Sequence, residues 1–95
     1  IKHPAATFFV RVTGDSMIGA GIHSGDLLVV DRSLDAVDGN VIVAALDGEL
    51  TVKRLFRQGT ILRLLPANAA YEPIEILTQQ SFEIFGVVTN VIHAL

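Results

Sequence analysis

The sequence predicts a mainly β domain, either a strongly bent or curled sheet or a partly open barrel, with at most a short helix after Ser16. Three observations carry this prediction. Apolar residues come in short blocks bounded by Gly, Asp, Asn and Pro. No window of about a dozen residues has helical spacing. The blocks are rich in β-branched and aromatic residues, which favour strands. Six or seven strands in a chain of 95 residues favour one sheet folded over on itself.

Seven apolar blocks are the candidate strands. In chain order they cover residues 8–12, 27–31, 41–46, 49–56, 60–65, 74–77 and 82–92, of which 74–77 is the weakest. Asp47 and Gly48 separate two of them and predict a two-residue hairpin turn. Gln58 and Gly59 predict a second turn before Thr60. Residues 1–7 are expected to form an N-terminal arm, and residues 8–95 a single domain.

Composition excludes several classes of protein. The chain has no cysteine, which removes disulfide scaffolds and thiol nucleophiles. Its longest unbroken apolar run, Val41 to Leu46, is far shorter than the roughly 20 residues of a membrane-spanning helix. A net charge of −3 is the wrong sign for strong direct binding of nucleic acid. The 51% apolar share favours a face covered by a partner. With no signal sequence in view, we expect a cytoplasmic protein.

Ser16 is the first candidate for chemistry. It follows Gly14, which allows a sharp turn off the end of the first strand. If a short helix begins at this turn, its free N–H groups lie where an oxyanion needs stabilising. The plainer interpretation is that Asp15 or Ser16 caps the turn.

Lys53 is the second candidate. Strand alternation places it on one face with Thr51 and Leu55. A lysine partly buried on such a face loses its proton more easily, because desolvation disfavours the ammonium, and it can then act as a base. The plainer interpretation is a lysine whose stem is buried and whose ammonium reaches water.

Other chemistries are less well supported. His3, His23 and His93 show no ligand-like spacing, so we expect no metal site and no cofactor. His23 could serve as a base for Ser16, but it lies between glycines in an expected turn. The remaining features have plainer explanations: turn formation for Gly19, Gly21, Gly25, Asp26, Asp31, Asp35 and Asp38, and a solvated strand end for Lys53, Arg54 and Arg57.

Several motifs together resemble one family. They are Gly14-Asp15-Ser16-Met17, Gly25-Asp26-Leu27-Leu28-Val29-Val30-Asp31, Asp47-Gly48-Glu49-Leu50-Thr51-Val52-Lys53-Arg54-Leu55, Leu65-Pro66-Ala67-Asn68, Tyr71-Glu72-Pro73-Ile74 and Phe85-Gly86-Val87-Val88. In this order they resemble the LexA/UmuD family of self-cleaving serine–lysine peptidases, of the S24 type. The resemblance implies a bent β fold, with Ser16 as nucleophile and Lys53 as general base. It also implies cleavage of an upstream segment at a small-residue–glycine bond, stimulated by the RecA filament on single-stranded DNA. Ala20-Gly21 has these residue types but is expected to be a turn.

Two further stretches resemble the UmuD branch, with its plasmid-borne relatives such as MucA. They are His3-Pro4-Ala5-Ala6-Thr7-Phe8-Phe9-Val10 and Val87-Val88-Thr89-Asn90-Val91-Ile92. This resemblance implies the processed form, a homodimer that joins a Y-family polymerase catalytic subunit in error-prone translesion synthesis during the SOS response. The peptidase activity would then be largely spent. The alternatives are the peptidase and dimerisation domain of a LexA-like repressor and, less favoured, a type I signal peptidase domain.

Overall fold

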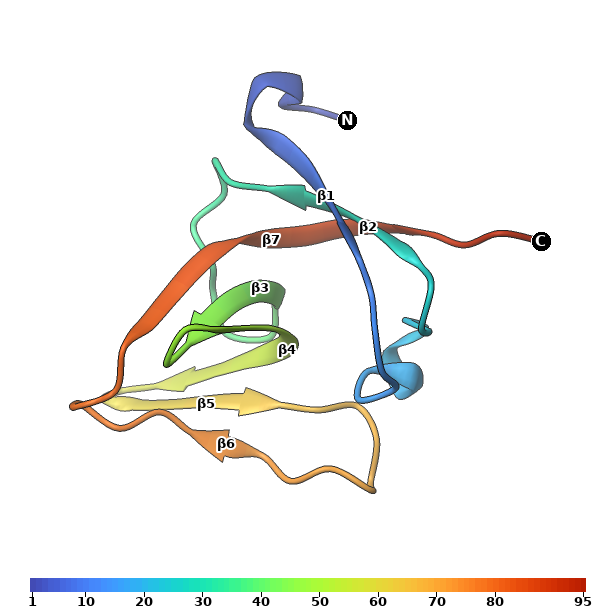
Figure 1. The fold of residues 1–95 in the computed structure, drawn as a ribbon. Helices are drawn as coiled ribbons and strands as arrows, with labels where there is room; N and C mark the ends of the chain where they lie inside the picture. Colours follow the sequence, from blue (N-terminus) through green and yellow to red (C-terminus); the bar gives the residue numbers. More distant parts are fainter.

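The computed structural model describes all 95 residues and contains one antiparallel sheet of seven strands (Figure 1). The strands are β1 (Thr7–Arg11), β2 (Leu27–Asp31), β3 (Val41–Leu46), β4 (Glu49–Gln58), β5 (Ile61–Leu65), β6 (Ile74–Glu75) and β7 (Phe82–Ile92). Two single-turn 3₁₀ helices complete the secondary structure, η1 (Pro4–Ala6) and η2 (Ile18–Ala20). The predicted mainly β fold is confirmed, as a sheet that does not close into a barrel. No helix is long and apolar enough to cross a bilayer.

The hairpin turns follow local sequence closely. Asp47 and Gly48 have φ of 49° and 84°, the left-handed values that a tight two-residue turn requires, so this predicted hairpin is confirmed. The second predicted turn was wrong by one residue. Gln58 pairs with Ile61 as the last rung of the β4–β5 ladder, so the turn consists of Gly59 and Thr60.

The expected arm is partly structured. Pro4–Ala6 forms η1, and β1 begins at Thr7, one residue before the predicted strand. His3 Nδ1 lies 2.6 Å from Asp31 Oδ2, which ties this segment to the end of β2. Hydrogen bonds from Ser33 and His3 lower the pKa of Asp31 to about 2.

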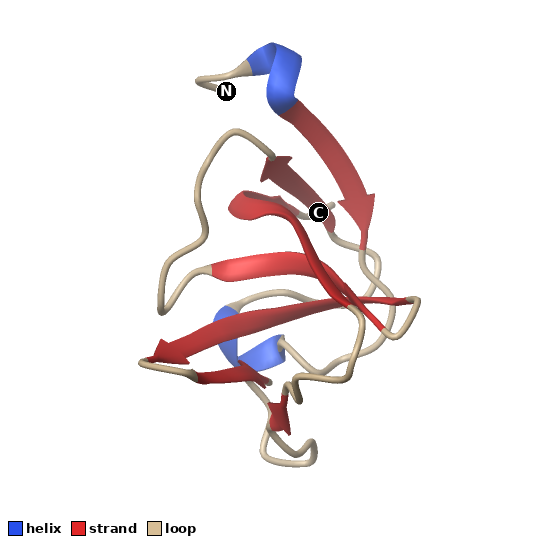
Figure 2. Ribbon diagram, turned by 90° about the vertical axis from the view of Figure 1, so that its left-hand side faces the viewer, coloured by secondary structure: helices blue, strands red, loops and turns tan.

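β7 is the strand that joins the two halves of the sheet. In the strand order β1-β2-β7-β3-β4-β5-β6, it pairs with β2 on one side and with β3 on the other (Figures 1 and 2). The pairing shifts register at Val29/Val30 on β2 and at Val43/Ala44 on β3, and such bulges bend a sheet. Gly86 lies at this bend, where a Cβ atom would come within 2.7 Å of the Val30 side chain.

The bent sheet encloses two hydrophobic clusters. The first centres on Val12, Met17, Ile22, Leu28, Val30 and Val43, and the second on Ile42, Ala44, Leu55 and Leu64. β3 contributes alternate residues to the two clusters, so both of its faces are buried. This explains why residues 41–46 are a continuous apolar run rather than an alternating one. Met17, the residue directly after Ser16, belongs to the first cluster.

Candidate active site

Ser16 lies on a tight turn between β1 and η2. Gly14 takes φ of 85°, which lets the chain leave β1 sharply. Met17, which follows Ser16, is only 2% exposed and anchors the turn in the core. Ser16 itself is half-buried. The short helix expected after Ser16 is present as η2, a single 3₁₀ turn.

The loop between β5 and β6 holds this turn from outside through backbone hydrogen bonds. The Ala67 N–H donates to the Ser16 carbonyl at 2.8 Å, and the Gly19 N–H donates to the Ala67 carbonyl at 2.7 Å. Gly19 allows this close approach, because a Cβ atom there would come within 2.6 Å of the Ala67 oxygen. Ala67 therefore fixes both sides of the serine turn.

Two side chains of the same loop hold Asp15. The Asn68 side-chain amide donates to the Asp15 carbonyl at 3.0 Å, and the Tyr71 hydroxyl donates to the Asp15 carboxylate. This carboxylate raises the pKa of Tyr71. Asn68 and Tyr71 belong to two of the family motifs, but the sequence predicted no role for either. Residues more than fifty positions apart give no local signal of such contacts.

Lys53 reaches Ser16 from β4. Its Nζ lies 3.0 Å from Ser16 Oγ, 2.8 Å from Thr51 Oγ1 and 3.1 Å from the Val52 carbonyl oxygen. Thr51 and Lys53 share a strand face, as alternation predicted. Burial lowers the pKa of Lys53 from its ordinary value, because desolvation disfavours the ammonium. The structure thus brings together a hydroxyl and an amine whose residues are separated by 37 positions.

A cleft of about 220 Å³ opens over this pair. Its walls are residues 10–14, 16 and 17 on one side and residues 50–53 of β4 on the other. β1 is an edge strand of the sheet, paired only with β2, so the strand beside the cleft has one unpaired edge. Such an edge can pair with an extended peptide.

The N–H groups of the short helix were expected to be free to stabilise an oxyanion, but in the structure they have acceptors. The N–H groups of η2 are occupied: Ile18 donates to Asp15, Gly19 to Ala67 and Ala20 to Met17. Among the chain's hydrogen bonds, none uses the N–H of Asp15 or of Ser16 as donor. The free amides therefore belong to the serine turn rather than to the helix that follows it.

Comparison with known proteins identifies the family of this chain. The family model described as Peptidase S24-like matches residues 1–89. The chain belongs to the Peptidase S24 family. Protein SamA of Salmonella typhimurium is 52% identical over 93 residues, a match that covers 98% of this chain and 64% of that protein. LexA repressor 2 of Pseudomonas putida is 52% identical over 80 residues, covering 84% of this chain and 40% of the repressor. The chain spans less than two thirds of either relative.

In this Peptidase S24 chain, the other residues considered from sequence lie elsewhere. His23 Nδ1 faces Asp26 at 3.8 Å, and no hydrogen bond joins His23 to Ser16. Of the basic residues near Lys53, Arg54 donates to the Gly39 carbonyl and Arg57 to the Ala36 carbonyl, so both brace the loop before β3. Asp26 and Asp31 accept backbone N–H groups in turns, as expected of turn formers, whereas Asp38 accepts the N–H of Arg57 in β4.

Proposed function

We propose that this chain is the peptidase domain of a self-cleaving protein, with Ser16 as nucleophile and Lys53 as general base. The observation that carries the proposal is the contact of 3.0 Å between Lys53 Nζ and Ser16 Oγ. A nucleophilic serine needs a base within hydrogen-bond reach, and a desolvated lysine can serve without a third residue. Membership of a peptidase family supports the same assignment.

The neighbours of Lys53 fit this role. A protonated lysine has three N–H donors, and here three oxygens surround Nζ. When the amine is neutral, two donors remain for Thr51 and the Val52 carbonyl. Its lone pair is then left for the Ser16 O–H. The contacts that bind the ammonium thus also aim the free base at the nucleophile.

The proposed reaction is acyl transfer followed by hydrolysis. Lys53 takes the Ser16 proton as Oγ attacks the carbonyl carbon of the scissile peptide, and the free amides of Asp15 and Ser16 are the candidate donors to the oxyanion. Lys53 then gives the proton to the leaving amine. Water attacks the acyl-serine ester, with its proton passing through Lys53, and releases the second product.

A covalent serine probe tests the assignment on this chain directly. A fluorophosphonate reacts with activated serine hydroxyls, with fluoride as leaving group, and intact-mass spectrometry counts the label. We expect one label on Ser16, and Ser16→Ala should abolish it. Lys53→Ala should slow labelling by at least about a hundredfold, because general-base catalysis contributes that much.

The chain offers close controls for both residues. Ser24 is an exposed serine in the turn after η2, and Lys2 is the only other lysine of the chain. Ser24→Ala and Lys2→Ala should label at the rate of the unaltered chain. Labelling that persists in Ser16→Ala, or that is unchanged in Lys53→Ala, would refute the proposed pair.

For the biological role we propose the UmuD-type processed subunit. It would act as a homodimer with a Y-family polymerase catalytic subunit, and its precursor would cleave itself under stimulation by RecA on single-stranded DNA. In support, the resemblance at residues 3–10 and 87–92 favours the UmuD branch, and the SamA match runs along 98% of the chain. The peptidase activity would be largely spent once the upstream segment is removed.

The match to LexA repressor 2 favours a second candidate, the peptidase and dimerisation domain of a repressor. Primer extension across an abasic site distinguishes the two. If the chain is UmuD-type, adding it to a Y-family catalytic subunit should increase bypass. Heat-denatured chain at the same concentration is the control that shows whether any increase depends on the folded domain. No increase with the unaltered chain would favour the repressor.

A further inference from the structure

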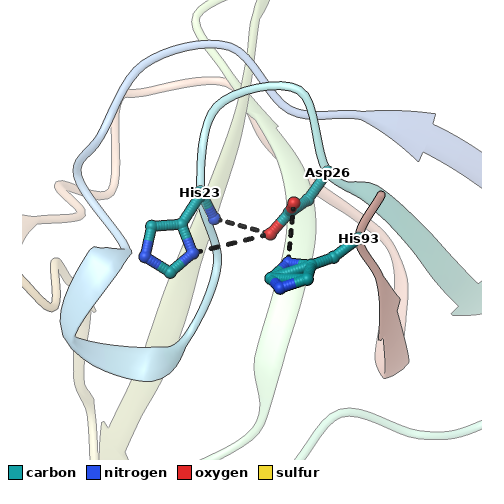
Figure 3. A group of neighbouring side chains, drawn as sticks. All are labelled: His23, Asp26 and His93. Carbon is teal, nitrogen blue, oxygen red and sulfur yellow. Dashed lines mark hydrogen bonds and ion pairs between the residues drawn. The ribbon is translucent and has the colours of Figure 1, made fainter. Parts of the chain in front are cut away.

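Three side chains outside the serine–lysine cleft converge on one point. His23 lies in the loop between η2 and β2, Asp26 lies directly before β2, and His93 follows the end of β7 (Figure 3). One ligand atom from each residue lies within 4.8 Å of the others. His93 Nδ1 is 3.1 Å from Asp26 Oδ1, and His23 Nδ1 is 3.8 Å from Asp26 Oδ2.

We propose that His23, Asp26 and His93 form a binding site for a divalent transition metal of the zinc type. Imidazole nitrogen and carboxylate oxygen are ligands that Zn²⁺ takes in proteins, and three such ligands leave a fourth position for water. At metal–ligand bonds of about 2.0–2.2 Å, tetrahedral ligand atoms lie roughly 3.3 Å apart. The two nitrogen–oxygen separations lie on either side of this value, 3.1 Å to Oδ1 and 3.8 Å to Oδ2 of Asp26. Binding one ion would require the exposed imidazoles to rotate toward a common point.

The carboxylate is fixed in advance and the imidazoles are accessible. The side chain of Asp26 is only 8% exposed, and its Oδ2 accepts the backbone N–H of His23 at 2.8 Å. The His23 and His93 side chains are 56% and 53% exposed, so a hydrated ion can reach them. No lysine or arginine pairs with Asp26, so the histidines are its only ionisable partners. A bound cation would offset this buried charge.

The site is separate from the proposed peptidase chemistry. None of its three residues lines the cleft over Ser16 and Lys53. Its ligands come from two places that the sheet brings together, since Asp26 and His93 are 67 positions apart. The expectation of no metal rested on the spacing of the histidines and on the lack of cysteine, and neither indicates a ligand that lies 67 positions away. A bound metal would link the end of β7 to the loop before β2.

Isothermal titration of the untagged chain with ZnCl₂, in a buffer free of chelators, tests the site. We expect saturable binding of one Zn²⁺ per chain and no saturable binding of Mg²⁺, which prefers oxygen ligands. His23→Ala and His93→Ala should each weaken Zn²⁺ binding by at least about tenfold. Both histidines are exposed, so circular dichroism should show an unchanged fold for these variants.

His3 provides the matched control. It pairs with a buried aspartate, Asp31, as His93 pairs with Asp26, but it has no second histidine beside it. His3→Ala should bind Zn²⁺ like the unaltered chain. Co²⁺ should give the strong visible absorption of a tetrahedral ion with the unaltered chain and lose it with His93→Ala. Absence of saturable 1:1 binding, or equal weakening by His3→Ala and His93→Ala, would overturn the proposal.

Discussion

The chemical behaviour of Lys53 depends on its immediate surroundings. Thr51 and the Val52 carbonyl accept from its Nζ on the strand side, and Ser16 meets it from the opposite wall of the cleft. Burial lowers the pKa of Lys53, so the neutral amine is more populated near neutral pH than in an exposed lysine. This change makes an ordinary strand lysine suitable as a base.

The pH dependence of Ser16 labelling follows from this shift. Only the neutral amine accepts the serine proton, so the rate should rise with pH and level off once Lys53 is deprotonated. Because the pKa of Lys53 is lowered, the midpoint should lie below the ordinary lysine value of 10.5. Lys53→Arg keeps the charge but cannot lose its proton, so this rise should disappear. Fluorophosphonate rates measured between about pH 6 and pH 11 give the midpoint, and a midpoint at or above 10.5 would contradict this account.

Sequence reasoning singled out Ser16 and Lys53 as candidates, but it could not show that their side chains are in contact. From residue types alone, the plainer interpretations were favoured, a turn cap at Ser16 and a lysine at position 53 whose ammonium reaches water. Only the family resemblance gave them roles. Their contact depends on a turn after β1 and on strand β4, which the whole sheet brings together. Local patterns carry no information about such a distance.

Among the elements, the loop between β5 and β6 has the largest unpredicted role. It connects the candidate strand 60–65 to the weakest candidate, 74–77, and the sequence predicted no role for it. In the structure it contacts the serine turn through Ala67, Asn68 and Tyr71. The strands were easier to predict, because an unbroken apolar run such as residues 41–46 directly reflects burial on both faces.

Gly19→Ala tests whether this loop positions the serine. The added methyl group would come within 2.6 Å of the Ala67 carbonyl oxygen, so the loop and the turn must separate. We expect destabilisation of about 1–3 kcal/mol, typical of overpacking, together with slower labelling of Ser16. Chemical denaturation and the fluorophosphonate rate measure the two effects.

Ile18→Ala is the matched control for Gly19→Ala. Ile18 belongs to the same 3₁₀ turn, but its side chain is 41% exposed, so the substitution should change stability and labelling much less. Tyr71→Phe removes the hydroxyl that donates to Asp15 and should slow labelling without a large loss of stability. Unchanged labelling in both Gly19→Ala and Tyr71→Phe would show that the loop does not position Ser16.

At the scale of the whole molecule, one face of the β1–β2–β7 region carries exposed apolar side chains. Phe9 pairs with Val29, and Leu27 pairs with Ile92, so alternation places these four residues on the same face. Val29 is buried and Leu27 half-buried, so Phe9 and Ile92 are the exposed members of this face. Phe9 and Ile92 are each 52% exposed. Such a face suits the partner surface that the 51% apolar composition predicted.

We therefore expect a homodimer that uses this face. Sedimentation velocity at micromolar concentration should show a dimer, and Phe9→Asp should shift it toward monomer, because an unpaired charge would be buried at the contact. Val37→Asp is the control, since Val37 is similarly exposed at 57% but lies in the loop before β3. A monomer at this concentration, or equal effects of the two substitutions, would contradict the assignment of this face.

The position of β7 also has a consequence for how the molecule acquires its structure. β7 is the last of the seven strands to be synthesised, yet it pairs with both β2 and β3 and alone connects the two halves of the sheet. Until a ribosome has released it, β2 and β3 each lack a neighbour. Complete folding of this domain therefore waits until β7 is available, and a chain that lacks β7 exposes two strand edges open to aggregation.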